Sequence, residues 1–314
     1  MGRMTFVLRR LLQLVPVAIG CTIVVFFMIH LIPGDPARTI LGIHATPRAV
    51  ALLHQEWGLN RPLISQYWLF MDRLLHGNLG VSLYYGGSAL SLILTHLPPT
   101  LWLIAYSSVL AVLISVPLAI IAASRKDGAR DHAVRVVPLL GLGMPQFWLA
   151  FLLIYAFAIK FHFFPVSGWG TGFFGHLRSM FLPSLTVALA LAPVVIRSLR
   201  ASMLNVLGAE FVTTARSKGV AGKRLFLRHV LRNAVIPAVT VLGINIGFLI
   251  GGTVIIENVF AIPGLGQLMI NSIFQRDFTV VQGITLVFAI MVILLNLAAD
   301  VAYAALDPRV RFSR

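Results

Sequence analysis

The residue patterns that could carry enzyme chemistry are incomplete in this chain. Residues 170–175, GTGFFG, satisfy the G-x-G-x-x-G pattern, but a dinucleotide-binding fingerprint needs a strand before it and a helix after it in a βαβ unit. The run lies in an expected loop between long apolar segments, so we interpret it as a chance match. A P-loop is missing as well, because Gly222 and Lys223 are followed by Arg224. The chain therefore cannot hydrolyse a nucleotide by P-loop chemistry, and we predict no catalytic residue on it.

Metal-ligating and nucleophilic residues give no stronger pattern. The 9 His show no H-E-x-x-H run or other paired ligand spacing, so we predict no metal site. Cys21 is the only cysteine, which excludes an intrachain disulfide and a cysteine-based zinc site. It follows Arg9 and Arg10 in an apolar run, a loose likeness to a lipoprotein signal, but Ala18 fits that pattern poorly and the run continues to Ile32. We therefore expect an uncleaved first segment.

Long apolar helices must position whatever site the chain has. Of its 314 residues 58% are apolar and only 11% charged, against roughly 25% charged in an ordinary soluble domain. About 20 helical residues cross a bilayer core of about 30 Å. The candidate spans are Leu11–Ile32, Pro98–Ala123, Val134–Phe161, Met180–Ile196, Val235–Ile256 and Val280–Tyr303. The sequence thus predicts an all-α polytopic membrane protein with six transmembrane helices.

The positive charge indicates how these helices are oriented. The formal net charge is +15, which could suggest nucleic-acid binding. Most of the Lys and Arg fall near the N-terminus, in the second and fourth connections and near the C-terminus, which share one side of the membrane if there are six spans. The positive-inside rule then places both termini in the cytoplasm. We therefore attribute the charge to topology in the bacterial cytoplasmic (inner) membrane and predict no nucleic-acid partner.

The expected spans divide the chain into four parts. Pro33, Gly34 and Pro36 end the first helix because proline cannot continue the backbone ladder, and Asp35 is placed to cap the next helical stretch. The parts are an N-terminal transmembrane helix over 1–32, an extracytoplasmic segment over 33–97, a core of five helices over 98–306 with a cytoplasmic loop over 201–233, and a cytoplasmic tail over 307–314.

The loop is unusually basic for so apolar a chain, with eight Lys and Arg between Arg197 and Arg232. Residues 203–218 are predicted to form one helix with an apolar stripe. The stripe consists of Leu204, Leu207, Phe211 and Ala215. Gly219 is expected to end this helix, since glycine tolerates the left-handed conformation, and residues 223–233 form a second helix that runs into the fifth span. A basic helix pair of this kind suits anionic lipid or docking to a cytoplasmic protein, and these residues alone do not separate the two.

The motifs of the whole chain resemble one family. EFVTTARSKGV followed by RHVLRNAVIP is similar to the cytoplasmic loop of type I ABC-importer permeases of the dipeptide/oligopeptide/nickel subfamily. The resemblance continues in RRLLQLVP, HLIPGDP, GLNRPL, GNLGVS, LPPTL, ENVFAIPGLG, RDFTVVQG and LDPRVR. The loop departs from the general E-A-A…G pattern, because Thr213 stands at the glutamate position, Glu210 lies three residues earlier, and Pro237 comes later than the strict spacing.

The resemblance implies a non-catalytic transport subunit with several partners. Its loop would dock on an ATPase and transmit motion to the spans through Leu207, Glu210, Phe211, Thr214, Ala215 and Gly219. The partners that the resemblance implies are a homologous second permease subunit, two cytoplasmic ABC ATPase subunits or domains and an extracytoplasmic solute-binding protein, with membrane lipid around the chain. The chain itself would hold no cofactor, since ATP and Mg would bind to the ATPase.

Polar or small residues inside the spans are candidates for the translocation path, because polar groups that face lipid are costly. These candidates are Gln146, Asn245, Gly247 and Glu257. Close helix packing is the competing explanation for the glycines. We expect a solute of the di- or oligopeptide class, with nickel or metal-chelate import and glutathione-type peptide import as alternatives. A lone channel would not explain the loop, and an intramembrane enzyme would need a buried ionisable cluster that the spans lack.

Overall fold

The computed structural model describes residues 3–31, 35–42, 45–82, 84–124, 126–220 and 222–306. Pro33, Gly34 and the predicted tail over 307–314 lie outside the described residues. Contacts divide the chain into two compact units. Unit 1 comprises Leu101–Ile262 and the chain from Leu295, and unit 2 comprises the chain up to Thr100 together with Pro263–Leu294.

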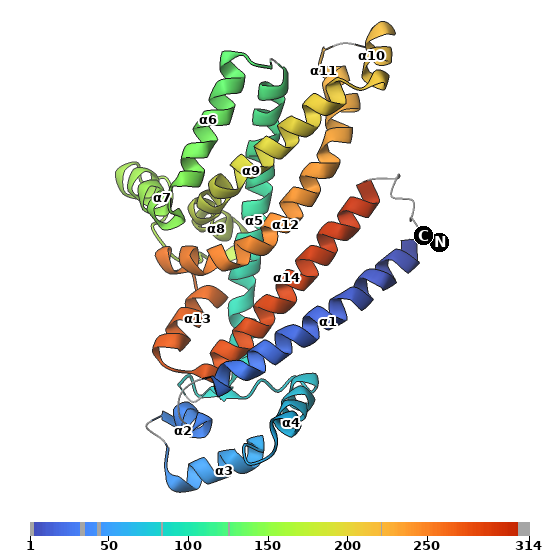
Figure 1. Cartoon of the computed structure of the whole chain (residues 1–314). Helices are drawn as coiled ribbons and strands as arrows, with labels where there is room; N and C mark the ends of the chain where they lie inside the picture. The colour runs from blue at the N-terminus through green and yellow to red at the C-terminus, as the bar shows by residue number, and fades with distance from the viewer. Residues whose placement is uncertain are drawn as a thin grey trace. The chain divides into compact units, whose positions relative to one another are not determined.

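All the regular elements of unit 1 among its described residues are helices. Its elements are most of α5 (Ala89–Ser124), α6 (Ala129–Gly143), α7 (Gln146–Leu153), the π-helix η2 (Ile154–Lys160), α8 (Gly172–Ser179), α9 (Phe181–Leu207), α10 (Glu210–Ser217), α11 (Gly222–Arg224), the π-helix η3 (Leu225–Leu231), α12 (Arg232–Val259) and the end of α14 (Phe278–Leu306). The backbone stays helical from α7 into η2 and from α11 through η3 into α12. Figure 1 shows α10 beyond the end of α9, beside α11.

Two apolar clusters hold unit 1 together. The larger joins α5, α7, η2, α9 and α12, and its fully buried members include Leu103, Met180 and Ile256. The smaller contains Ala119, Ala123, Leu199, Met203, Val230 and Ala234, and so joins α5, α9, η3 and α12 near the end of α9. In water, burying each of the larger side chains would stabilise the fold by about 1.5–3 kcal/mol. Inside a bilayer, close packing between helices stabilises the fold instead.

Unit 2 contains the remaining helices and, among the described residues, the only strands. Its elements are α1 (Arg3–His30), α2 (Pro36–Leu41), α3 (Pro47–Trp57), α4 (Leu63–Leu75), β1 (Val81–Ser82), β2 (Gly87–Ser88), the start of α5, α13 (Leu265–Phe274) and the first part of α14. The strands pair antiparallel, with Val81 opposite Ser88. The predicted cap at Asp35 is confirmed, because its side chain accepts a hydrogen bond from the Ala37 amide at the start of α2.

Hydrogen bonds between distant parts of the chain fix the elements of unit 2. The Gln282 amide donates to the Val25 carbonyl over 2.9 Å, which joins α14 to α1. The hydroxyl of Ser82 donates to the Asp277 carboxylate, which ties the strand pair to the start of α14. Thr100 accepts a hydrogen bond of 2.9 Å from the Leu265 amide and so holds α13 against α5.

The helix lengths modify the predicted spans. Over the described residues, three helices are long and apolar enough to cross a membrane, and these are Ala89–Ser124, Phe181–Leu207 and Phe278–Ala302. Shorter apolar helices cover Leu12–Met28, Gln146–Lys160, Leu249–Val259 and Leu265–Phe274. The predicted span Val134–Phe161 is wrong as a single helix, because α6 ends at Gly143 and α7 begins at Gln146. The α region is disfavoured before proline, and Met144, which precedes Pro145, is extended (φ −92°, ψ 133°).

Candidate functional site

The α10 segment, residues 207–219, differs from the single helix that the sequence predicts over 203–218. Helix α9 ends at Leu207, and the backbone of Ala209 is extended (φ −76°, ψ 145°) before α10 begins at Glu210. Gly208 lies at this break, where its low helix propensity, about 1 kcal/mol below that of alanine, favours an interruption. The predicted stripe therefore does not form one helix face.

The break separates the stripe into buried and exposed parts. Leu204 and Leu207 pack against the smaller apolar cluster of unit 1. Phe211 lies beyond the break on α10 and is 44% exposed, whereas its neighbour Val212 is fully buried. The buried Val212 fixes α10 to the rest of the unit, and the exposed Phe211 ring is accessible for contact with another molecule.

The other predicted residues of α10 are exposed or take part in local bonds. Glu210 is the first residue of the helix and is exposed. The hydroxyl of Thr214 donates to the Glu210 carbonyl over 3.0 Å, so this side chain is already hydrogen-bonded within the helix. Ala215 is half-buried. The exposed surface of α10 therefore combines one aromatic ring with polar groups and the cations Arg216 and Lys218.

Gly219 ends α10 as predicted. Its φ is +79°, and two hydrogen bonds close the turn, from the Gly219 amide to the Arg216 carbonyl (2.9 Å) and from the Val220 amide to the Ala215 carbonyl (3.0 Å). This pair of bonds defines a Schellman motif with glycine at the left-handed position. A Cβ on Gly219 would meet nothing within 4 Å, so the backbone angle and not space favours glycine here.

The candidate path residues lie apart on α7 and α12. Gln146 starts α7 directly after the break at Met144 and Pro145, and its side-chain oxygen lies 3.0 Å from where a Cβ on Gly252 would stand. Asn245 donates its side-chain amide to the Val241 carbonyl of its own helix over 2.7 Å. Glu257 is fully buried. Asn245 and Glu257 stand about 18 Å apart along α12 at 1.5 Å per residue, so they cannot belong to one compact binding site.

The glycines of α12 differ in how closely neighbouring elements approach them. Gly247 is half-buried. A Cβ on Gly243 would overlap the Cβ of Ala299 on α14, so the two backbones approach closely there. A Cβ on Gly251 would meet nothing within 4 Å. Close packing thus explains Gly243, and Gly251 has room for a side chain.

A largely buried ion pair, in which the Arg200 side chain is 16% exposed, lies near the start of α6 and was missed from the sequence. Asp131 on α6 is fully buried and takes two hydrogen bonds from Arg200 on α9, from Nε to Oδ1 at 2.5 Å and from Nη2 to Oδ2 at 2.6 Å. The Asp127 amide also donates to Oδ2 (3.0 Å), and Arg135 approaches the same oxygen at 3.6 Å. The hydrogen bonds from Arg200 lower the pKa of the Asp131 carboxyl from 3.8 to about 2, against the opposing effect of burial. No local pattern could reveal a pair whose members stand 69 residues apart.

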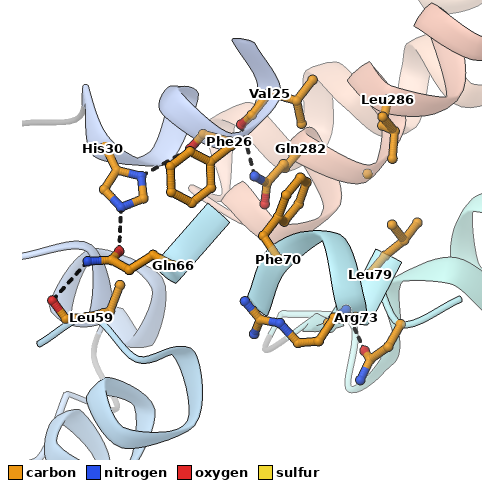
Figure 2. Close-up of a pocket in the computed structure, with 13 residues that line it drawn as sticks. Val25, Phe26, His30, Leu59, Gln66, Phe70, Arg73, Leu79, Gln282 and Leu286 are labelled. Atoms are coloured by element: carbon orange, nitrogen blue, oxygen red, sulfur yellow. Dashed lines mark hydrogen bonds between the residues drawn. The ribbon is translucent and has the colours of Figure 1, made fainter. Parts of the chain in front are cut away.

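Unit 2 encloses a small cavity between α1, α4 and α14, shown in Figure 2. His30 and Gln66 face each other there, with 2.9 Å between Nε2 and Oε1. The Gln66 amide nitrogen donates to the carbonyls of Leu59 (3.1 Å) and Arg61 (2.8 Å). These polar groups are used in bonds within the unit, so they fasten α4 to α1. Among the described residues, no group of three or more His, Cys, Asp or Glu could hold a metal ion.

Comparisons with known proteins cover nearly the whole chain. The family model described as a binding-protein-dependent transport system inner membrane component matches residues 115–312, and the model for the N-terminal part of such membrane components matches residues 3–102. The glutathione transport system permease protein GsiC of Escherichia coli (strain K12) is 38% identical over 309 residues, which cover 98% of this chain and 99% of GsiC. GsiC of Salmonella choleraesuis (strain SC-B67) shows the same identity and coverage.

Solved structures of two transporters share the fold. An inward-facing form of the MetNI methionine ABC transporter aligns with a TM-score of 0.59 at 18% identity, over 69% of this chain and 97% of the MetNI chain. An amino acid ABC transporter crystallised with histidines aligns with a TM-score of 0.51 at 16% identity, over 68% of this chain and 94% of the other.

Proposed function

This chain belongs to the family of binding-protein-dependent transport system inner membrane components and is a permease subunit of an ABC importer, and we propose that it forms half of the path for glutathione-like or other short peptides. The observation that carries the solute class is the similarity to GsiC over almost the entire length of both chains. The path on this chain runs along α7 and α12, where Gln146, Asn245, Gly247 and Glu257 are spread over several helix turns. So dispersed a set suits a permissive tunnel, with a separate binding protein choosing the solute.

The ATPase docks on the α10 segment. The support for this proposal is the exposed Phe211 ring on a short helix that the buried Val212 fixes to unit 1. Arg216 and Lys218 add exposed positive charge to the same segment, and the turn at Gly219 sets the direction in which the chain leaves α10. ATP binds to the partner with its Mg and brings the two ATPase subunits together. Because ATP has different affinity for the two states of the partner, it shifts the docked permease between inward- and outward-facing forms.

The assembly and its orientation follow from the same role. We propose six spans with both termini in the cytoplasm, a homologous second permease subunit across the path, two ATPase subunits or domains, and an extracytoplasmic binding protein. The distribution of Lys and Arg supports this orientation. Cysteine labelling tests it, since Cys21 is the only cysteine of the sequence. In a Cys21→Ser background a membrane-impermeant maleimide applied to intact spheroplasts should label Tyr85→Cys but not Ser217→Cys, and the reverse pattern contradicts the orientation.

Charge placed on α10 tests the docking. Phe211→Asp should reach the membrane but no longer co-purify with the ATPase, and uptake should be lost, because the ring can no longer enter an apolar groove. Asn205→Asp is the matched control, since it adds the same charge at an exposed position on the last turns of α9. Retained co-purification and uptake in Phe211→Asp would show that α10 is not the docking element.

Uptake by the reconstituted complex tests the solute. Proteoliposomes that contain the full permease pair, the ATPase and the binding protein should accumulate radiolabelled glutathione or a dipeptide when ATP is enclosed on the ATPase side. The same vesicles given nickel, alone or chelated by histidine, should accumulate no more than vesicles without ATP. ATP-dependent nickel uptake without peptide uptake would refute the solute class and leave the docking proposal intact.

A further inference from the structure

The Asp131–Arg200 pair joins helices α6 and α9, which are far apart in the sequence. Asp131 lies in the first turn of α6, and Arg200 lies on α9, two turns before that helix ends. Their two hydrogen bonds, of 2.5 and 2.6 Å, run from two guanidinium nitrogens to both carboxylate oxygens. Such a paired contact fixes both distance and direction, unlike a single ion pair. The start of α6 therefore cannot rotate or slide along α9 without breaking it.

The α9 end of this link is held rigidly. Leu199 and Met203, which flank Arg200 in the chain, are 1% and 0% exposed and belong to the smaller apolar cluster. Leu207, the last residue of α9, packs against the same cluster. Closely packed interiors transmit displacement and do not absorb it. A force applied to α10 would thus reach Arg200 through one packed body.

The α6 end leads to the break before α7. Helix α6 packs along α9 and ends at Gly143, and the chain is extended at Met144 before Pro145 starts α7. Figure 1 shows α6 and α7 leaving this break in different directions. Gln146, directly after the break, lies against Gly252 on α12. A movement of α6 would therefore act on the point where the candidate path residue Gln146 is held.

We propose that the Asp131–Arg200 pair is a positioning link that makes α6 move together with α9, so that motion of the ATPase at α10 reaches the Met144–Pro145 break and Gln146. The proposal rests on the proposed docking at α10 and adds the route of transmission. Neither residue touches the solute or the nucleotide. The pair sets how much solute moves for each ATP, and ATP hydrolysis itself does not require it.

Removing both charges separates positioning from stability. Replacing a buried ion pair by apolar residues of similar size is often tolerated, whereas removing one partner leaves a buried charge. Asp131→Leu with Arg200→Met should therefore accumulate in the membrane, co-purify with the ATPase and hydrolyse ATP at the wild-type basal rate. Solute transported per ATP should fall at least about fivefold, in the range of typical coupling between sites. An unchanged ratio would overturn the proposal.

A conservative variant covers the case in which the double variant does not accumulate. Arg200→Lys keeps the charge but cannot form two parallel bonds. It should lower the solute-to-ATP ratio with little change in ATPase affinity. If Arg200→Lys transports at the wild-type ratio, a point charge suffices at this position and the proposed directional link is wrong.

Distances between spin labels test the rigid link directly. Val136 on α6 and Arg197 on α9 are exposed, and labelled cysteines at both positions, in a Cys21→Ser background, report the spacing of the two helices in the full complex. The wild-type link should keep that distance unchanged between nucleotide-free and ATP-trapped states. In the Asp131→Leu, Arg200→Met double variant the distance should become nucleotide-dependent or broad. A wild-type distance that already changes with ATP would contradict the link, whereas loss of docking in Phe211→Asp alone bears on the proposed function.

Discussion

Replacement of Gly219 isolates the contribution of one backbone angle to coupling. The residue has φ +79° and no atom within 4 Å of an added Cβ, so alanine there meets no steric obstacle outside its own backbone. The left-handed conformation costs an L-residue roughly 1–2 kcal/mol, and asparagine tolerates it better than other residues. That energy is a factor of about 5 to 30 in the fraction of molecules with the turn closed. β-Branched valine should be the most unfavourable.

The assay is the affinity of the purified permease pair for its ATPase, measured with solute uptake at equal membrane levels. Affinity should fall in the order Gly219, Gly219→Asn, Gly219→Ala, Gly219→Val, with Ala reduced by about 5- to 30-fold. Gly251→Ala on α12 is the control, because Gly251 has no positive φ and its added Cβ would also meet nothing within 4 Å. Equal affinities for the Gly, Asn and Ala forms would refute the role of the left-handed turn.

Two further predictions concern packing and pH. Gly243→Ala should destabilise the α12–α14 contact by about 1–3 kcal/mol through overpacking, and adding Ala299→Gly should restore thermal stability. Gly251→Ala alone should be tolerated. A Gly243→Ala protein as stable as wild type would contradict the close approach of the two helices. His54 Nε2 lies 2.8 Å from Asp35 Oδ1. This hydrogen bond raises the pKa of His54 above 6.5. Burial alone would raise the pKa of Asp35, but hydrogen bonds from His54 and from the Ala37 amide lower it below 3.8. The pair should thus stabilise α2 fully between about pH 4 and 6.5 and lose that effect as pH rises through the His54 pKa. Hydrogen exchange of the α2 amides, corrected for intrinsic rates, would detect this pH dependence. His54→Gln should abolish it.

Family and fold could be predicted from the sequence because the signal is spread over many segments. The resemblance to importer permeases is confirmed by family models that match residues 3–102 and 115–312. Local chemistry also sufficed for single turns. Asp35 could be assigned as a cap from the proline after it, and Gly219 could be assigned as a helix end from its place after a polar helix.

The break between α9 and α10 could not be predicted from the apolar stripe, because it depends on packing. A stripe at helical spacing across Gly208 favours one helix, yet burial of Val212 on one side and Leu207 on the other requires a change of direction. The break before α7 was open to prediction, because Pro145 restricts the backbone of Met144 by a local rule that the expected third span ignored. The expected start at Pro98 fell inside α5, which begins at Ala89 after the strand pair. Asp131 and Arg200 gave no signal, since only the folded chain brings them together.

The unbroken helical run from Gly222 to Val259 sets a length scale for the assembly. At 1.5 Å per residue it extends about 57 Å, which exceeds the 40–45 Å or so of a bilayer with its headgroups. Where this helix crosses the bilayer steeply, the end that joins α10 would stand outside the headgroup layer. A docking ATPase would then contact this end of the helix in water, beyond the headgroup layer. Its affinity for the permease should not depend on the thickness of the surrounding membrane.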